Sequence, residues 1–275
     1  MKTLTKIEAI NPAGDILSLE LADNSSGLQL EAVDGLDPVK ATLTGSGYAG
    51  KDGAQFQSAK REIRALSIYL AFVPDYVTTQ VPDLRNLLYS FFMPKTAVTL
   101  KFFLGEELVV TLACRTETMG STPFSRNPGA KIDLLAFDPD FLEEEPTAIG
   151  GDTVDDSEED TITYQGTVET GFQFDLNVDR DMDQVTVYLR TPDGTLRSMD
   201  VTVDMIAGDI LTISTVRGNK YVQLLRSGIA TSVLYAMSPQ SSWLELFPGD
   251  NLIRVYDTGD PVLWTVTYTA RYGGL

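Results

Sequence analysis

The chain contains no histidine and only one cysteine, and both scarcities narrow the chemistry open to it. Without histidine the chain can form no Ser-His-Asp or Cys-His catalytic arrangement and no histidine-bound metal site. It also lacks the side chain that most often serves as a general base. The single Cys114 can form neither an intramolecular disulfide nor a thiolate metal cluster, so the fold needs no oxidising compartment. Carboxylates, lysines and tyrosines remain for chemistry, and a reducing cytoplasm suits the chain.

Long apolar runs are also missing. No stretch reaches the roughly 18 apolar residues of a membrane span, and residues 1–30 lack the apolar core of a signal peptide, so we expect neither a membrane segment nor export. The 275 residues, 43% hydrophobic and 22% charged, indicate a globular chain with one large or two ordinary domains. The net charge of −18 opposes phosphate binding, so nucleic acid is not an expected partner.

The negative charge is concentrated in one stretch. Residues 1–137 hold 13 basic and 15 acidic groups, residues 138–160 hold 0 and 11, and residues 161–275 hold 8 and 13. The middle stretch also has two prolines, a Gly-Gly pair and no periodic apolar pattern, which predicts an exposed acidic linker between two domains. The alternatives are an acidic loop that faces a partner or a channel and, less favoured, a metal site.

The first 137 residues show alternation with one helical interruption. Residues 2–10 and 15–21 predict a hairpin across Asn11–Gly14, and residues 98–104 and 108–114 predict a second hairpin that turns at Gly105-Glu106. Cys114 falls in the apolar stripe of that second hairpin, which indicates a structural role. Between the hairpins, the spacing predicts one short helix near 82–93, whose apolar face is formed by Leu84, Leu87, Leu88 and Phe91.

Residues 161–275 contain about ten short strand-like runs separated by turn signals, which predicts an antiparallel β-sandwich. In the last long run, Val262, Trp264, Val266 and Tyr268 share one face, so Trp264 is expected in the core. Trp243 is either a core anchor, which we favour, or a platform on which a sugar stacks. The predicted fold class is therefore mainly β, with a helix in the N-terminal domain and a sandwich in the C-terminal one.

Two motifs suggest ligand chemistry and both fail. Gly45–Asp52 matches G-x-G-x-x-G and most of a phosphate-binding loop, but Asp52 replaces the hydroxyl that should hold magnesium and would repel phosphates, so a glycine loop between strands is favoured. Asp179–Asp183 matches the first ligands of a calcium loop, but Gln184 and Arg190 occupy the positions of the required glycine and glutamate. A solvated turn between strands is favoured there.

The sequence thus predicts no catalytic, cofactor-binding or metal-binding residues and no cofactor. A pair of carboxylates for glycoside hydrolysis is defined by its separation in space, and no motif points to such a pair. An enzyme remains a minority interpretation, with a secreted glycosidase as its most concrete form.

Several segments, none of them specific alone, follow one another in an order that is similar to a known family. They are REIRALSIYLAF (61–72), PDLRNLLYSFFMPKTAVTLKFF (82–103), the hairpin after Gly105, AKIDLLAFDP (130–139), YQGTVETGF (164–172), GDILTIST (208–215) with Gly218-Asn219-Lys220, SSWLELFPGDN (241–251) and TYTARYGGL (267–275). Their order resembles the distal tail protein family of long non-contractile-tailed bacteriophages, whose members form the hub at the end of the tail tube.

The resemblance implies an N-terminal domain (1–137) that forms a homohexameric ring, an acidic linker (138–160) and a galectin-like sandwich (161–275) outside the ring. It implies a structural, non-enzymatic protein of the virion tail tip, made in the bacterial host cytoplasm, that joins the tail tube protein to the tail tip or tail-associated protein. DNA would pass through the lumen without specific binding. Members that bind host sugars often carry extra insertions, for which this chain has no room, and this favours the plain structural form. The alternative function is a carbohydrate-binding β-sandwich module that mediates host attachment.

Overall fold

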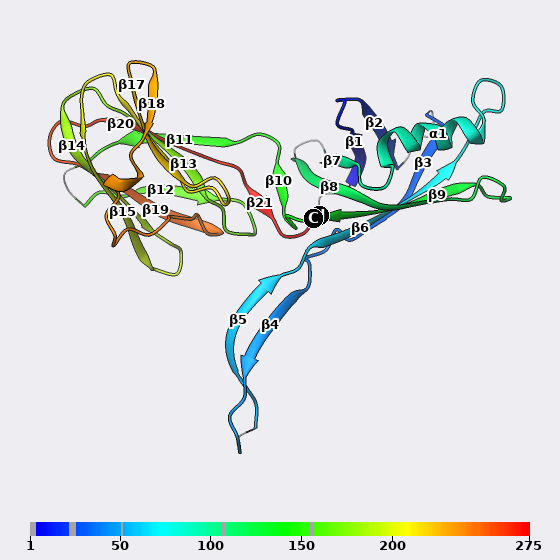
Figure 1. The fold of residues 1–275 in the computed structure, drawn as a ribbon, viewed down its shortest axis with the longest axis horizontal. Helices are drawn as coiled ribbons and strands as arrows, with labels where there is room; N and C mark the ends of the chain where they lie inside the picture. The colour runs from blue at the N-terminus through cyan, green and yellow to red at the C-terminus, as the bar shows by residue number, and fades with distance from the viewer. Residues whose placement is uncertain (1–3, 22–25, 51, 106–107, 155–156) are drawn as a thin grey trace. The chain divides into compact units, whose positions relative to one another are not determined.

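A computed structural model describes residues 4–21, 26–50, 52–105, 108–154 and 157–275 (Figure 1). The chain forms two compact units. Unit 1 comprises Met1–Glu144 together with Gly273–Leu275, and unit 2 comprises Glu145–Tyr272. Strands dominate both units, as predicted, and α1 (Val81–Phe92) is the one α-helix within the described ranges.

Unit 1 is built on an antiparallel sheet in the order β2-β1-β7-β8-β9-β6-β3, with β10 paired to β8. Its strands are β1 (Leu4–Ile10), β2 (Ile16–Glu20), β3 (Leu28–Asp34), β6 (Arg64–Phe72), β7 (Ala97–Leu104), β8 (Leu108–Ser121), β9 (Gly129–Ala136) and β10 (Phe141–Glu143). A separate antiparallel pair, β4 (Ala41–Ser46) and β5 (Gln55–Arg61), is inserted between β3 and β6.

Both predicted hairpins of unit 1 are confirmed. Ile7 pairs with Leu19 in the first, where the Asn11 side chain fixes the turn by accepting from the backbone N–H groups of Ala13 and Asp15. In the second, Val98 pairs with Cys114 on the buried face. Burial raises the pKa of the Cys114 thiol to about 12, which leaves it protonated and inert. The predicted turn at Gly105-Glu106 lies partly outside the described residues, because Glu106 is not among them.

The predicted helix near 82–93 is confirmed as α1. Asp83 accepts a hydrogen bond from the backbone N–H of Gln80 at 3.0 Å, which completes the first turn. Leu84, Leu88 and Phe91 are buried as expected, but Leu87 is exposed and Phe92 is buried instead. The buried stripe therefore follows i, i+4, i+7 and i+8, and Leu87 lies at its margin.

Unit 2 is the predicted β-sandwich. One sheet has the order β11-β20-β13-β16-β17-β18 and the other the order β12-β19-β14-β15. The strands are β11 (Thr147–Asp152), β12 (Asp160–Tyr164), β13 (Phe172–Asn177), β14 (Met182–Arg190), β15 (Leu196–Met205), β16 (Ile210–Ser214), β17 (Tyr221–Arg226), β18 (Ile229–Ser232), β19 (Gly249–Tyr256), β20 (Leu263–Tyr268) and β21 (Arg271–Tyr272), with a 3-10 turn η1 (Leu234–Ala236).

The core of the sandwich is organised around Trp264, which is buried as predicted. Its ring stacks on Phe174, with the two centroids 6.3 Å apart, and its indole N–H donates to the backbone oxygen of Asp152 at 2.9 Å. Burying an indole in this way satisfies its one polar group. Trp243 is half-buried and packs against the same core, with the Lys220 ammonium 5.4 Å from the centre of its ring.

The stretch 138–160, predicted as an acidic linker, instead carries β10, β11 and the first residue of β12. The Gly150-Gly151 pair, interpreted as a linker signal, lies inside β11 where that strand pairs with β20. A side chain at Gly151 would approach the Trp264 ring to 2.6 Å, so this glycine is required by close packing within a strand.

Candidate assembly surface

The structure places both rejected ligand motifs in connections between strands. Gly45–Asp52 begins at the end of β4 and runs into the tip of the β4–β5 hairpin, and no helix follows it, as a phosphate-binding loop would require. The interpretation as a glycine loop between strands is confirmed, although Lys51 lies outside the described residues.

Asp179–Asp181 lie in the connection from β13 to β14, Met182 and Asp183 begin β14, and the side chain of Arg180 anchors the connection. The Arg180 guanidinium forms an ion pair with Asp257 and donates from Nε to the backbone oxygen of Asp260 at 3.0 Å. In the described part of the chain, no group of three or more cysteines, aspartates or glutamates is arranged to hold a metal ion. The interpretation as a turn is confirmed.

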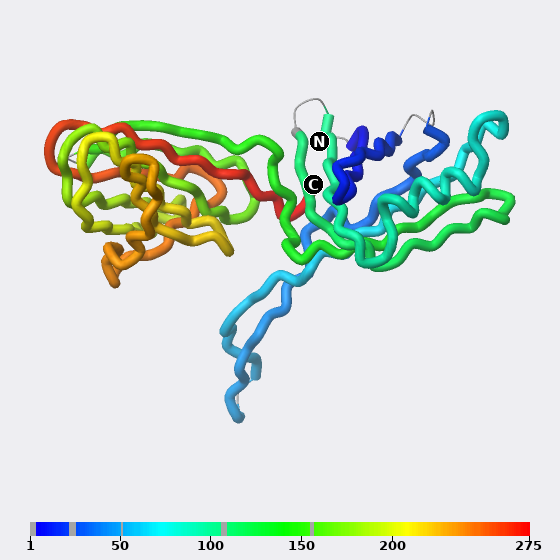
Figure 2. The backbone as a smooth tube through the Cα atoms, turned by 45° about the horizontal axis from the view of Figure 1, so that its top comes forward, coloured from blue at the N-terminus to red at the C-terminus, as the bar shows by residue number. Residues whose placement is uncertain are grey.

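The most unusual feature of unit 1 is the β4–β5 arm, which we define as residues 41–61. It projects away from the sheet from which it arises (Figures 1 and 2), and none of its described residues is buried. Three large apolar side chains stand in solvent on it: Leu43 is 70% exposed, Phe56 65% and Tyr48 61%. An isolated two-stranded hairpin is only marginally stable in water, and exposed apolar side chains of this size mark interaction surfaces.

The local sequence explains the shape of the arm. Residues pair in register from Ala41 with Arg61 to Thr44 with Ser58, and a bulge then places Phe56 opposite Gly45. Because Gly45 has no side chain, nothing across the strand covers the Phe56 ring. The only side-chain hydrogen bond at the tip joins the Tyr48 hydroxyl to Gln55 Oε1 at 2.7 Å, among the described residues.

The arm also differs in charge from the rest of the chain. Between Lys40 and Glu62 there are four basic residues and two acidic ones, a local balance of +2 in a chain whose net charge is −18. A basic, partly apolar arm on an acidic protein is electrostatically complementary to a second copy of that protein.

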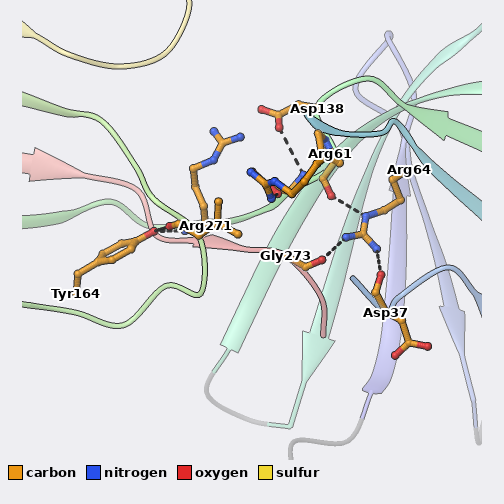
Figure 3. Close-up of polar contacts among 10 residues, drawn as sticks. Asp37, Arg61, Arg64, Asp138, Tyr164, Arg271 and Gly273 are labelled. Atoms are coloured by element: carbon orange, nitrogen blue, oxygen red, sulfur yellow. Dashed lines mark hydrogen bonds and ion pairs between the residues drawn. The ribbon is translucent and has the colours of Figure 1, made fainter. Parts of the chain in front are cut away.

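The root of the arm is fixed by two arginines (Figure 3). Arg61, the last residue of β5, forms a bidentate ion pair with the buried Asp140, in which the Nη2–Oδ2 distance is 3.1 Å. Such paired, planar contacts are geometrically demanding and resist rotation. The arm therefore begins from a rigid base.

Arg64, three residues further along the chain, is buried, and its guanidinium donates hydrogen bonds to backbone oxygens of separate segments of unit 1. Its guanidinium donates to Pro139 at 2.7 Å, to Asp37 at 2.8 Å, to Gly273 at 2.6 Å and to Gly35. It also stacks on Phe141, with the guanidinium carbon 4.3 Å from the ring centre. Burial lowers the pKa of Arg64, and these carbonyl dipoles compensate for the water that the cation has lost.

A second group of exposed apolar side chains lies where β6 ends, whereas the arm is rooted where β6 begins. We define this end cluster as Tyr76, Val77 and Phe124, which lie in the loops 73–80 and 122–128. Phe124 is 97% exposed. The two loops are linked at their bases, because the N–H of Phe72 donates to the backbone oxygen of Pro128 at 2.9 Å.

Loop 73–80 is exposed but well held. The Asp75 carboxylate accepts from the Thr78 hydroxyl and from the backbone N–H groups of Val77, Thr78 and Thr79 at 2.8–3.0 Å. The Thr78 hydroxyl bond is the main cause that lowers the pKa of Asp75 to about 2. Tyr76 adopts a left-handed backbone conformation with φ 57°, so the loop presents its apolar side chains in a fixed conformation.

Sequence reasoning missed both apolar surfaces. The signal that could have found the arm is alternation without a buried face: ATLTGS and QFQSAKR have strand-like composition but no apolar stripe. Strands that bury nothing in their own fold are candidates for burial against another chain.

Unit 1 combines a rigidly rooted arm with a separate apolar end, and unit 2 is a two-sheet sandwich. No helix in the described ranges is long and apolar enough to cross a membrane. This combination describes a β-rich chain with two separate exposed apolar surfaces on unit 1.

Comparison with known proteins finds a family model and solved structures to which the chain is similar. Residues 165–272 match the family described as siphovirus-type tail component, C-terminal domain. The fold of 96% of the chain matches 98% of the crystal structure of SPP1 Dit, described as a paradigm of the hub adsorption apparatus in phages that infect Gram-positive bacteria, with a TM-score of 0.68 and 14% identity. The resemblance to the distal tail protein family is thereby confirmed.

A weaker likeness is to the phage P2 baseplate in its activated conformation with Ca, where 99% of this chain aligns with 100% of that chain at 10% identity and a TM-score of 0.46. No curated protein matches the chain significantly.

Close packing explains the glycines near the start of the region that matches the family. The buried Tyr164 hydroxyl donates to the backbone oxygen of Val168 at 2.7 Å and accepts from the N–H of Arg271 at 2.9 Å (Figure 3). A side chain at Gly166 would lie 2.1 Å from that hydroxyl, and one at Gly171 would lie 2.4 Å from the backbone oxygen of Thr215. Both glycines are required by close approach rather than by flexibility.

Proposed function

We propose that this chain is a structural protein of a siphovirus tail, the distal tail hub, and that unit 1 assembles head to tail into a closed hexameric ring. The ring would join the tail tube protein to the tail tip or tail-associated protein, in a virion whose parts are made in the host cytoplasm. The observation that carries the proposal is the β4–β5 arm, none of whose described residues is buried, in a chain with the fold of SPP1 Dit. No catalytic step forms part of this function.

The physical basis is a heterologous contact. A ring of identical subunits needs two different surfaces on each subunit, and closure leaves neither exposed. The arm supplies one surface, rooted at Arg61 and Arg64, while the end cluster lies beyond the other end of β6. Covering Leu43 and Phe56 would remove apolar area from water, and the basic arm would be attracted to an acidic neighbour.

The ring would leave a lumen through which DNA passes. A conduit for DNA should avoid clusters of lysine and arginine, because phosphate neutralisation releases counterions and holds the DNA in place. The net charge of −18 suits such a conduit. Reversing the charge of lumen-facing carboxylates should slow DNA ejection, and unchanged ejection would contradict this part of the proposal.

The ring is tested by the mass and shape of the purified full chain, using light scattering and negative-stain imaging. The native chain should form a closed particle with a central hole, whereas Leu43→Ser/Phe56→Ser should remain monomeric at the same concentration with an unchanged unfolding midpoint. Leu263→Ser is the matched control, because Leu263 is an exposed leucine on β20 of unit 2. A native chain that stays monomeric up to its solubility limit contradicts the ring, and a ring that survives the double substitution contradicts the role of the arm.

A further inference from the structure

Unit 2 has a groove between the edge strands of its two sheets. β15 is the edge of one sheet and β18 the edge of the other, and the groove between them has a volume of about 560 Å³. Its floor includes the buried side chains of Leu224 and Val233, where the sandwich core reaches the surface. The groove is independent of the arm and the end cluster, which belong to unit 1.

An aromatic ring and several oxygen atoms surround this apolar floor. Tyr235, in η1, is 82% exposed although it lies beside the core residue Val233. The carboxylates of Asp183 and Asp204 and the hydroxyls of Thr202 and Thr231 line the groove, and none of them has a hydrogen-bond partner in the described part of the protein. These groups can both accept from and donate to a ligand.

Arg226, the one cationic side chain among the described residues that line the groove, is hydrogen-bonded within unit 2. Arg226 donates from Nη2 to the buried Asp209 at 2.6 Å and to the backbone oxygen of Asp204 at 2.9 Å, and its Nε also reaches Asp209 at 3.0 Å. The guanidinium therefore supports the wall of the groove, while Asp183 and Asp204 give the opening a negative charge. Anionic ligands such as phosphate or acidic sugars are disfavoured by this charge.

From this arrangement we infer that the β15–β18 groove is a binding site for a neutral saccharide, with the sugar ring on Tyr235 and its hydroxyls on Asp183 and Asp204. A pyranose has an apolar C–H face that packs on an aromatic ring and a rim of hydroxyls that donate to carboxylates, and it carries no charge. A peptide that adds a strand is a poorer fit, because β18 has only four residues and the β15 edge already pairs at Asp200 and Val201 with Ser238 and Met237.

The test uses the full chain and an array of immobilised neutral di- and trisaccharides of hexose, N-acetylhexosamine and deoxyhexose, with sialylated and sulfated glycans as charged controls. The strongest neutral hit is then titrated by calorimetry. Tyr235→Ala should weaken binding at least about tenfold and Asp204→Asn about fivefold. Tyr89→Ala is the control, because Tyr89 is an exposed tyrosine on α1 of unit 1, outside the arm and the end cluster, and its loss should leave the affinity unchanged.

Three results would overturn the site: no neutral glycan bound on the array, binding that survives Tyr235→Ala, or a preference for the charged controls. A lysine-rich peptide that binds in place of any glycan and is lost in Asp204→Asn would identify a peptide groove and likewise overturn the inference. The oligomeric mass of Tyr235→Ala should equal that of the native chain, so failure of the groove and failure of the ring are distinguishable.

Discussion

The β4–β5 arm and the β7–β8 hairpin are both antiparallel pairs in unit 1, yet they relate to the protein interior in opposite ways. Alternate residues of β7 are buried, from Val98 to Leu104, and β8 pairs onward with β9. The arm buries none of its described residues and pairs with no other strand among those described. The comparison shows that regular strand pairing does not reveal what stabilises a hairpin: one is held by its own sheet and the other is available to a neighbour.

Thiol labelling gives the largest expected difference between the two hairpins. At pH 8, a cysteine placed by Leu43→Cys on the exposed arm should react about 1000-fold faster than the native Cys114, because the buried thiol has a pKa of about 12 whereas an exposed one has a pKa of about 8.5. Stopped-flow labelling with a chromogenic disulfide measures both rates. Equal rates would show that the β7–β8 hairpin opens as freely as the arm, and assembly of the ring should slow the arm site alone.

Substitutions in the β7–β8 hairpin should also lower the free energy of unfolding more than substitutions in the arm. Leu100→Ala in β7 removes a fully buried side chain and should lower the free energy of unfolding by about 2–5 kcal/mol, whereas Leu43→Ala should change it by less than about 0.5 kcal/mol. Urea unfolding, with hydrogen exchange of the β7 and β8 amides as the local readout, measures this difference. A comparable loss in both variants would mean that the arm packs against its own chain.

Substitutions at the root of the arm should lower the free energy of unfolding, whereas substitutions in its strands should not. Arg64→Met removes the donor to four backbone oxygens and should destabilise unit 1 by about 2–3 kcal/mol, since the abandoned carbonyls stay partly buried. Arg64→Lys, which keeps the charge but offers fewer donors, should fall between this variant and the native chain. If unit 1 of the Arg64→Met variant had the same free energy of unfolding as unit 1 of the native chain, the root would be fixed by packing alone.

The smallest expected effect on stability concerns loop 73–80, which is exposed like the arm but is held by hydrogen bonds to the Asp75 side chain. The pKa of Asp75 is about 2 in the folded chain and about 3.9 when unfolded, so its contribution to stability is complete above about pH 4 and is lost as the pH falls toward 2. Asp75→Asn should therefore show a flatter dependence of stability on pH between 4 and 2. Parallel curves for the native chain and the variant would contradict the hydrogen-bonded loop.

The parts of the fold that could be predicted from sequence are those in which a buried face imposes a period. Trp264 and Cys114 each belong to a run in which alternate residues are buried, and α1 repeats its leucines at helical spacing, so most of these core positions were predictable. Gly150-Gly151 misled the prediction. A glycine that is required by a tryptophan ring nine strands later in the chain has the same local sequence signal as a glycine in a flexible linker.

The candidate surfaces could not be predicted for a related reason. Leu43, Phe56 and Phe124 bury nothing within their own chain, so no periodic pattern marks them, and their role depends on a second molecule that the sequence does not describe. The Tyr235 groove combines η1 with two strand edges that are brought together only by the tertiary fold.

The return of Gly273–Leu275 to unit 1 has a consequence for how the protein is made and how it can change. Unit 2 is an insertion whose two connections both lead into unit 1, so it can be enlarged or exchanged without redesign of the assembling unit. Arg64 and the backbone oxygen of Leu36 gain partners from residues that the ribosome adds only after unit 2 has been synthesised. Unit 1 therefore gains its last internal contacts only after the inserted sandwich has been synthesised.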